Sequence, residues 1–144
     1  MKRTADSRAT TRRRTRRWAL LPLVVVALVV AAFVISESRD GASAAQALTG
    51  QWTRPDGGYV LALSRIEAGG KVAASYFNPN PIRVSKAEVT RKNGALELFV
   101  ELRDEGYPGC TYRLRYDPAN DQLVGKYYQA ALRETYEVTF TRMN

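Results

Sequence analysis

Apolar and polar residues alternate along most of the sequence after Ala47, and this spacing of two is the feature that most restricts the fold. In the stretch 95–102 every second residue is apolar, whereas Glu97 and Glu101 fall on the opposite face. Successive side chains of a β-strand point to opposite faces, so the pattern predicts a strand with one face in a core. The same interpretation predicts seven further strands, at 49–54, 59–66, 72–77, 82–90, 111–116, 123–128 and 136–141.

Short turns connect the predicted strands. Asn93-Gly94 favours a two-residue type I′ hairpin turn, because both residues tolerate a positive φ. The Pro-Gly pair within Tyr107–Cys110 favours a type II turn. Within 82–90 the apolar phase shifts near Ser85-Lys86, as a β-bulge would produce. Connections this short cannot form parallel crossovers, so we expect an all-β fold, an eight-stranded antiparallel meander that closes into a barrel.

Two short motifs resemble those of a known group of barrels. Gly50-Gln51-Trp52 lies on the first predicted strand, and Arg142 ends the last. This arrangement resembles the calycins, the lipocalin-like and avidin-like barrels, in which a late Arg packs over the Trp of a Gly-x-Trp motif. The resemblance implies that Trp52 and Arg142 close one end of the barrel, with a cation over an aromatic face. The segments 76–81 and 107–109 also resemble small bacterial envelope proteins, a likeness that implies no activity.

An uncharged apolar run, 18–35, precedes the predicted barrel. At about 1.5 Å per residue, a helix of this length reaches about 27 Å, close to the thickness of the bilayer core. In 1–17, eight Lys and Arg residues stand against one acid, Asp6, which predicts a cytoplasmic N-terminus. The resulting organisation is a basic cytoplasmic segment (1–17), a single transmembrane helix in the cytoplasmic membrane (18–35), a linker (36–47) and an exported β-barrel domain (48–144).

The alternative to an uncleaved anchor is a signal peptide. Small residues at 42–44 and 45–47 suit a cleavage site, and cleavage there would release a secreted domain. The apolar core of a signal peptide usually has about 7 to 15 residues, and 18–35 is longer. The length therefore favours the anchor.

The distribution of charge argues against a nucleic-acid partner. The whole chain carries a formal net charge of +8, but residues 36–144 hold 14 Lys and Arg against 13 Asp and Glu. The basic character therefore belongs to the N-terminal segment, where it sets the topology. A nearly neutral exported domain offers no surface that follows a phosphate backbone.

The residues that commonly carry catalysis are missing from the sequence. It contains no His, and Cys110 is its one Cys. The commonest general base and transition-metal ligand is therefore absent, and a zinc cluster or an intrachain disulfide is excluded. We expect no enzyme activity, metal or cofactor. The alternative is acid–base catalysis by Asp104 or Glu105, although adjacent acids in a turn usually point into solvent.

Two loops carry the residues that we expect to contact a ligand or partner. In 78–81, each Pro restricts the preceding Asn, so the loop holds two amide side chains rigidly beside aromatic rings. The candidate binding residues are Tyr76, Phe77, Asn78, Asn80, Arg103 and Tyr107. The alternative is that these corners simply end strands. All eight Tyr residues follow the linker, and those facing inward either line a pocket or fill the barrel.

Two classes of function remain. The first is a ligand-binding barrel that carries or senses a small apolar or aromatic ligand. The second is an accessory module that docks an envelope protein through the same loops, with a solidly packed interior. A cavity inside the barrel would favour the first class, because normally packed interiors have no room for a ligand.

Overall fold

The computed structural model describes residues 43–143. The predicted cytoplasmic segment 1–17, the predicted transmembrane helix 18–35 and the first part of the predicted linker lie outside the described residues. Within 43–143, none of the helical structure is long and apolar enough to cross a membrane.

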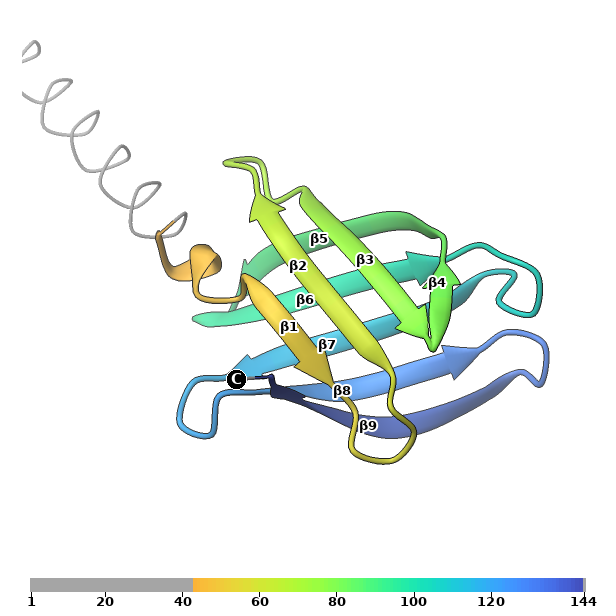
Figure 1. Cartoon of the computed structure of the whole chain (residues 1–144). Helices are drawn as coiled ribbons and strands as arrows, with labels where there is room; N and C mark the ends of the chain where they lie inside the picture. The colour runs from red at the N-terminus through yellow and green to blue at the C-terminus, as the bar shows by residue number, and fades with distance from the viewer. Residues whose placement is uncertain (1–42, 144) are drawn as a thin grey trace, which may run out of the picture. The chain divides into compact units, whose positions relative to one another are not determined.

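The described residues form nine strands in one antiparallel sheet, with the order β4-β3-β2-β1-β9-β8-β7-β6-β5 (Figure 1). The strands are β1 (Gly50–Thr53), β2 (Val60–Ile66), β3 (Val72–Asn78), β4 (Asn80–Ile82), β5 (Val84–Lys92), β6 (Ala95–Leu102), β7 (Cys110–Asp117), β8 (Gln122–Gln129) and β9 (Glu134–Arg142). The first and last strands are neighbours, since Trp52 pairs with Arg142 and Thr53 with Thr141. The all-β antiparallel fold predicted from the alternation is confirmed.

The predicted number of eight strands is wrong, because the predicted strand 82–90 is divided between two strands that pair with different neighbours. Asn80–Ile82 pairs with β3 as β4, whereas Val84–Lys92 pairs with β6 as β5. Arg83 lies between β4 and β5, so the chain passes at this residue from one edge strand of the sheet to the other. The predicted bulge is confirmed, since the β5–β6 register shifts between Val84 and Lys86.

The barrel is nearly closed rather than fully closed. Among the described residues, β5 and the start of β3 meet in a single bridge between Lys71 and Glu88. There the Val89 amide donates to the Gly70 carbonyl at 2.7 Å. Gly70 has φ +84°, and a Cβ on it would lie 2.3 Å from the Val89 carbonyl oxygen. Only glycine therefore fits this close approach without a backbone shift.

The two turns with clear sequence signatures have the predicted geometry. Asn93 and Gly94 have φ of 50° and 79°, the two positive values of a type I′ turn. Gly109 has φ 79°, and the Cys110 amide donates to the Tyr107 carbonyl at 3.3 Å, as a type II turn requires.

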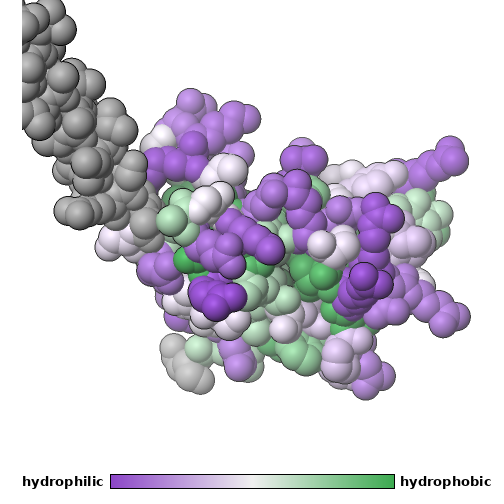
Figure 2. Space-filling view, turned by 90° about the horizontal axis from the view of Figure 1, so that it is seen from above, coloured by the Kyte–Doolittle hydropathy of each residue, from purple (hydrophilic) through white to green (hydrophobic). Residues whose placement is uncertain are grey.

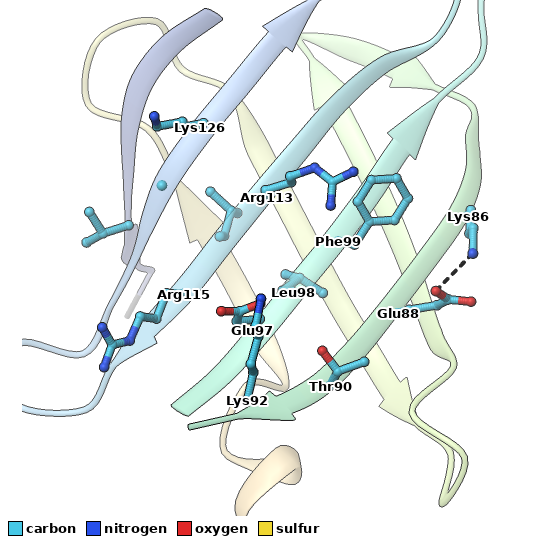
Figure 3. Close-up of a pocket in the computed structure, with 13 residues that line it drawn as sticks. Lys86, Glu88, Thr90, Lys92, Glu97, Leu98, Phe99, Arg113, Arg115 and Lys126 are labelled. Atoms are coloured by element: carbon cyan, nitrogen blue, oxygen red, sulfur yellow. Dashed lines mark ion pairs between the residues drawn. The ribbon is translucent and has the colours of Figure 1, made fainter. Parts of the chain in front are cut away.

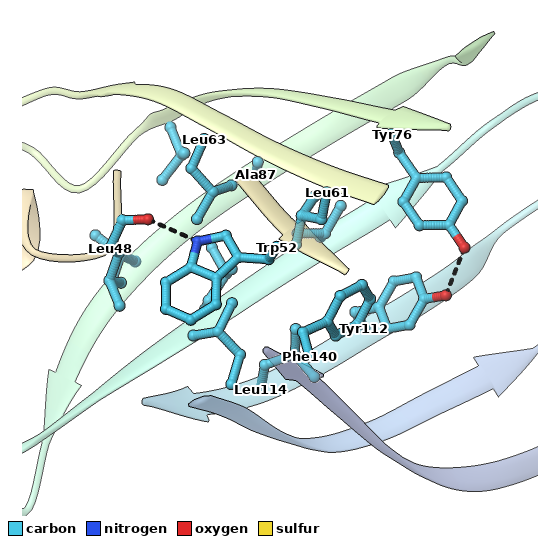
Figure 4. Packing of buried hydrophobic residues seen from close by; sticks show 14 of the residues in the cluster. Leu48, Trp52, Leu61, Leu63, Tyr76, Ala87, Tyr112, Leu114 and Phe140 are labelled. Atoms are coloured by element: carbon cyan, nitrogen blue, oxygen red, sulfur yellow. Dashed lines mark hydrogen bonds between the residues drawn. The ribbon is translucent and has the colours of Figure 1, made fainter. Parts of the chain in front are cut away.

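Large side chains fill the middle of the barrel (Figure 4). The most deeply buried include Trp52, Leu61, Leu98, Val100, Tyr112 and Phe140. They come from strands on opposite sides of the barrel, and every second residue of β6 is buried. The outward positions are mainly polar, and Figure 2 shows hydrophilic side chains over much of the face seen from above.

The barrel has two different ends (Figure 1). The closed end comprises Leu48, the start of β1, the end of β9 and the 118–121 turn. Here residues 43–46 form one helical turn, and Ala45 and Leu48 are buried in the core. The open end, which we call the mouth, comprises the loops 54–59, 103–109 and 130–133.

Candidate functional site

A pocket of about 520 Å³ opens at the mouth of the barrel. Six of the eight tyrosines of the chain line it. The lining of this mouth pocket is Arg54, Asp56, Tyr59, Tyr76, Gly106, Tyr107, Tyr112, Tyr127, Gln129, Tyr136 and Glu137. The mouth end of the barrel therefore contains a pocket, while the middle of the barrel is packed.

Stacked tyrosine rings form the walls of the mouth pocket. Tyr112 and Tyr127 stack with their centroids 4.6 Å apart, and Tyr136 stacks on the far side of Tyr127 at 6.4 Å. Tyr59 and Tyr76 stack at 6.4 Å with an angle of 15° between their planes. Rings that support one another in this way hold a fixed wall shape before any ligand arrives.

Arg54 is the buried charged residue in the lining of the mouth pocket, and only 8% of it is exposed. Its Nε donates to Asp56 Oδ1 at 3.0 Å and its Nη2 donates to Asp56 Oδ2, a two-point ion pair. Its Nη1 donates to the Tyr112 hydroxyl at 3.3 Å. The guanidinium also lies over the Tyr59 ring, 4.4 Å from the centroid.

The 54–59 loop brings Arg54 against the Tyr59 ring. The Arg54 amide donates to the Tyr59 carbonyl at 3.0 Å, which fastens the two ends of the loop together. A Cβ at Gly57 would lie 2.2 Å from the Tyr59 ring, so a residue without a side chain is needed beneath it. The loop therefore brings a cation and an aromatic face together.

A chain of hydroxyl groups connects Arg54 to the opposite wall. The Tyr112 hydroxyl lies 2.7 Å from the Tyr76 hydroxyl, and both side chains are buried (Figure 4). Burial raises the pKa of Tyr76 and of Tyr112, so both hydroxyls stay neutral. Burial lowers the pKa of Arg54, but its hydrogen bonds to Asp56 and Tyr112 raise it by more, and the guanidinium stays charged. The Arg54 hydrogen bonds also lower the pKa of Asp56.

Trp52 and Arg142, the pair expected from the Gly-x-Trp motif, lie together at the closed end. The guanidinium lies 4.1 Å from the centroid of the Trp52 ring. It donates to the carbonyls of Thr49 and Ala47 at 2.8 and 2.7 Å, and to Asp121 at 2.6 and 3.0 Å. The indole Nε1 donates to the Leu48 carbonyl at 2.9 Å. The polar groups of this end thus find their partners within the domain, and the Trp52 side chain between them is fully buried.

Gly50 makes room for this closed-end pair. Its φ is +134°, and a Cβ on it would lie 2.7 Å from Arg142 Nη1. The glycine of the motif is therefore explained by the arginine that lies beside it.

The structure places the predicted binding residues in different surroundings. Tyr76 and Tyr107 line the mouth pocket, and Asn78 donates a hydrogen bond to the Tyr107 hydroxyl from just outside it. Phe77 is half-buried and Asn80 is exposed, and neither lines the pocket. Arg103 is exposed and pairs with Glu101 at 2.8 Å.

Asp104 fastens a loop. Its carboxylate accepts hydrogen bonds from the amides of Arg83 and Glu105 at 3.1 and 2.9 Å. These backbone hydrogen bonds lower the pKa of Asp104, which is the opposite of what a general acid needs at neutral pH. Within residues 43–143, no cluster of three His, Cys, Asp or Glu side chains could hold a metal ion.

Nine residues of the mouth pocket were not among the predicted binding residues: Arg54, Asp56, Tyr59, Gly106, Tyr112, Tyr127, Gln129, Tyr136 and Glu137. The signal that could have found the four tyrosines among them is the excess of inward-facing Tyr near one end of the strands. A tyrosine offers an apolar face and a polar tip, and purely structural positions in a barrel need only the former.

A second hollow lies on the outer wall of β5–β8 (Figure 3). We call it the outer groove; its volume is about 650 Å³. Phe99 lies in it between two cations, with Arg113 5.0 Å and Lys86 5.8 Å from the ring centroid. Lys86 pairs with Glu88 at 2.9 Å. The remaining lining residues are Thr90, Lys92, Glu97, Leu98, Leu114, Arg115, Val124, Gly125 and Lys126.

The fold and the mouth pocket define a nearly closed antiparallel β-barrel with an aromatic pocket at its open end. This architecture is compatible with a calycin-like barrel. No protein-family model, curated protein or solved structure matches the chain.

Proposed function

We propose that this protein is a membrane-anchored, extracytoplasmic binding module that holds a small ligand in its mouth pocket and does not catalyse a reaction. The observation that carries the proposal is the pocket of about 520 Å³, lined by six tyrosines and by a buried Arg54 that pairs with the exposed Asp56. Ligand sites are typically concave and largely aromatic, with a few fixed polar groups.

The polar groups of the mouth pocket support a binding role. A buried charge is costly unless it is paired, and Arg54 is held by Asp56, Tyr112 and Tyr59 together. A solidly packed barrel needs none of these groups, because apolar side chains would fill the same volume at lower cost. Fixing them in advance reduces the entropy lost when a ligand binds.

The proposed anchor would join the domain at the closed end of the barrel. The described residues begin at Ser43, at the closed end, whereas the pocket opens at the mouth. If 18–35 spans the cytoplasmic membrane with 1–17 in the cytoplasm, then 36–42 joins the anchor to the closed end. The mouth then lies at the end of the domain away from this connection, where a ligand can reach it.

The proposal is tested with the full chain in lipid nanodiscs and small probes of different chemistry. Isothermal titration calorimetry with cellobiose, maltose, trehalose, N,N′-diacetylchitobiose, 4-methylphenol, benzoate and choline should show one-to-one binding of at least one probe. Absence of binding by every probe would overturn the proposal.

A matched pair of variants locates the binding. Tyr136 is 39% exposed at the mouth pocket, and Tyr128 is 38% exposed on the outside of β8. We expect Tyr136→Ala to weaken binding about 5- to 10-fold, the value of one stacked ring. Tyr128→Ala should leave the affinity unchanged. Equal effects of the two substitutions would place the ligand elsewhere.

A second candidate function is an accessory subunit that docks an envelope protein. The outer groove favours it, because the partly exposed Phe99 ring lies among cations on the outside of the sheet. A photo-crosslinking phenylalanine at position 99 should then capture one protein in native membranes, and the same group at position 135 on the outside of β9 should not. Identical products from both positions would refute a specific docking surface.

A further inference from the structure

We infer that the ligand of the mouth pocket is a neutral saccharide, with a ring face against the tyrosines and hydroxyls on Arg54, Asp56 and Gln129. This inference rests on the proposed binding function and names the chemical class of its ligand. It differs from the apolar or aromatic ligand expected from the sequence, because the polar groups found at the pocket were not predicted.

The charges of the mouth pocket favour an uncharged ligand. Arg54 and Asp56 form an ion pair and cancel each other. The Glu137 carboxylate pairs with Lys126 at 3.5 Å, on the outside of the sheet. An anion or a cation in the pocket would lose its hydration without gaining an unpaired opposite charge.

The polar groups favour a ligand that both donates and accepts hydrogen bonds. A guanidinium has five N–H donors, and among the described residues Arg54 uses three, on Asp56 and Tyr112. The Asp56 carboxylate keeps accepting positions beyond its two contacts with Arg54, and the Gln129 amide donates and accepts. Sugar hydroxyls satisfy both kinds of group, whereas a hydrocarbon ring would cover them and leave them unpaired.

The tyrosine walls supply the apolar half of the site. Tyr136 is partly exposed, and it stacks on Tyr127, which stacks on Tyr112. A sugar ring has a face of C–H groups that packs on an aromatic ring while its hydroxyls point outward around the edge. The pocket combines the same two kinds of group, with six tyrosine rings and the polar side chains of Arg54, Asp56 and Gln129 in its lining.

The class of ligand is tested by comparing probes on the full chain in lipid nanodiscs. We expect at least one of the four neutral disaccharides, cellobiose, maltose, trehalose and N,N′-diacetylchitobiose, to bind at least tenfold more tightly than 4-methylphenol, benzoate or choline. Tighter binding of any of these last three would overturn the saccharide while the proposed binding function stands. If none of the seven probes binds, both the saccharide inference and the proposed binding function are overturned.

Two substitutions separate the polar contribution from the apolar one. Gln129→Leu keeps the volume but removes the amide, so the best disaccharide should bind about 5- to 10-fold more weakly and 4-methylphenol within twofold of the original. Asp56→Asn removes the counter-ion of Arg54, so the disaccharide should bind more weakly and benzoate should bind more tightly. Unchanged disaccharide binding in both variants would contradict the inference. Circular dichroism of each variant checks that the barrel is intact.

Discussion

The closed end and the mouth of the barrel contain the same kinds of residue, but only the mouth has an open pocket beside its arginine. Each end has an arginine over an aromatic ring and a carboxylate that holds the arginine: Arg142 with Trp52 and Asp121, and Arg54 with Tyr59 and Asp56. At the closed end, Arg142 also donates to two backbone carbonyls, and Leu48 covers the indole. At the mouth, Arg54 borders an open pocket.

The two ends therefore differ in how they are covered rather than in their ion pairs, and the mouth is the end that we propose binds a ligand. The segment 43–48 covers Trp52 and accepts hydrogen bonds from the indole and from Arg142. The 54–59 loop does not cover the mouth in this way, because Arg54, Asp56 and Tyr59 line an open pocket there. Stability should therefore depend most on the closed end, and ligand affinity on the mouth.

The largest expected effect comes from Trp52→Ala. Trp52 is fully buried, and its removal leaves a cavity and an unpaired Leu48 carbonyl. We expect the free energy of unfolding to fall by about 3–5 kcal/mol. Urea unfolding of the full chain in non-ionic detergent, followed by circular dichroism, measures it. A loss below about 1 kcal/mol would contradict the structural role of the closed end.

Arg142→Met should have the next largest effect. It keeps much of the apolar stem over Trp52 but leaves the carbonyls of Ala47 and Thr49 and the Asp121 carboxylate without their donor. We expect a loss of about 2 kcal/mol, because unpaired polar groups are costly even when partly buried. The same unfolding measurement tests it, and ligand affinity should stay within twofold. Weaker ligand binding would show that the two ends are coupled.

Tyr112→Phe should have a smaller effect on stability and should act at the mouth. It removes the hydroxyl that links Arg54 to Tyr76. We expect a loss of about 1 kcal/mol, together with weaker binding of the best probe. Calorimetry and unfolding on the same sample check both quantities. An effect on stability alone would assign Tyr112 to packing only.

The smallest effect is the response to acid. Hydrogen bonds from Arg54 and Arg142 lower the pKa of Asp56 and of Asp121 below the ordinary value of about 3.9. The unfolded chain therefore takes up these protons at a higher pH than the folded one. The stability from each pair is fully present above pH about 4 and is lost as the pH falls through the lowered pKa. For partly exposed pairs we expect less than about 1 kcal/mol each.

Two variants test which end of the barrel carries the acid response. Asp121→Asn should make unfolding below pH 4 less sensitive to pH, and Asp56→Asn should do so independently. The measurement is urea unfolding between pH 2.5 and 7. If neither substitution changes the slope, other carboxylates carry the acid response.

Local features of the fold could be predicted from the sequence. The strand at 95–102 and the Asn93-Gly94 turn have the predicted bounds and geometry, because alternation and turn chemistry depend on neighbouring residues. The break at Arg83 was missed, because Ile82 and Val84 on its two sides continue the alternation without interruption. The break is visible only in the strand pairing, since Ile82 pairs with β3 and Val84 with β6.

The mouth pocket could be predicted only in part. Tyr76 and Tyr107 were found because aromatic residues stand beside strand ends that Pro and Gly mark. Arg54 was not found, since its partner Tyr112 is 58 residues away and nothing near Arg54 in the sequence indicates burial. A charged residue usually lies in solvent, and only the assembled barrel shows that this one has partners on three sides.

Because β1 and β9 are neighbours, the described chain both starts and finishes at the closed end, with the Met143 amide bonded to the Gln51 carbonyl at 2.8 Å. A strand of eight residues such as β6 is about 26 Å long, at about 3.3 Å per residue. A fluorescent protein or an affinity tag joined to the C-terminal side would therefore be attached at the end of the barrel opposite the mouth. Such a fusion leaves ligand access unobstructed, which makes the domain suitable for immobilisation or for use as a reporter.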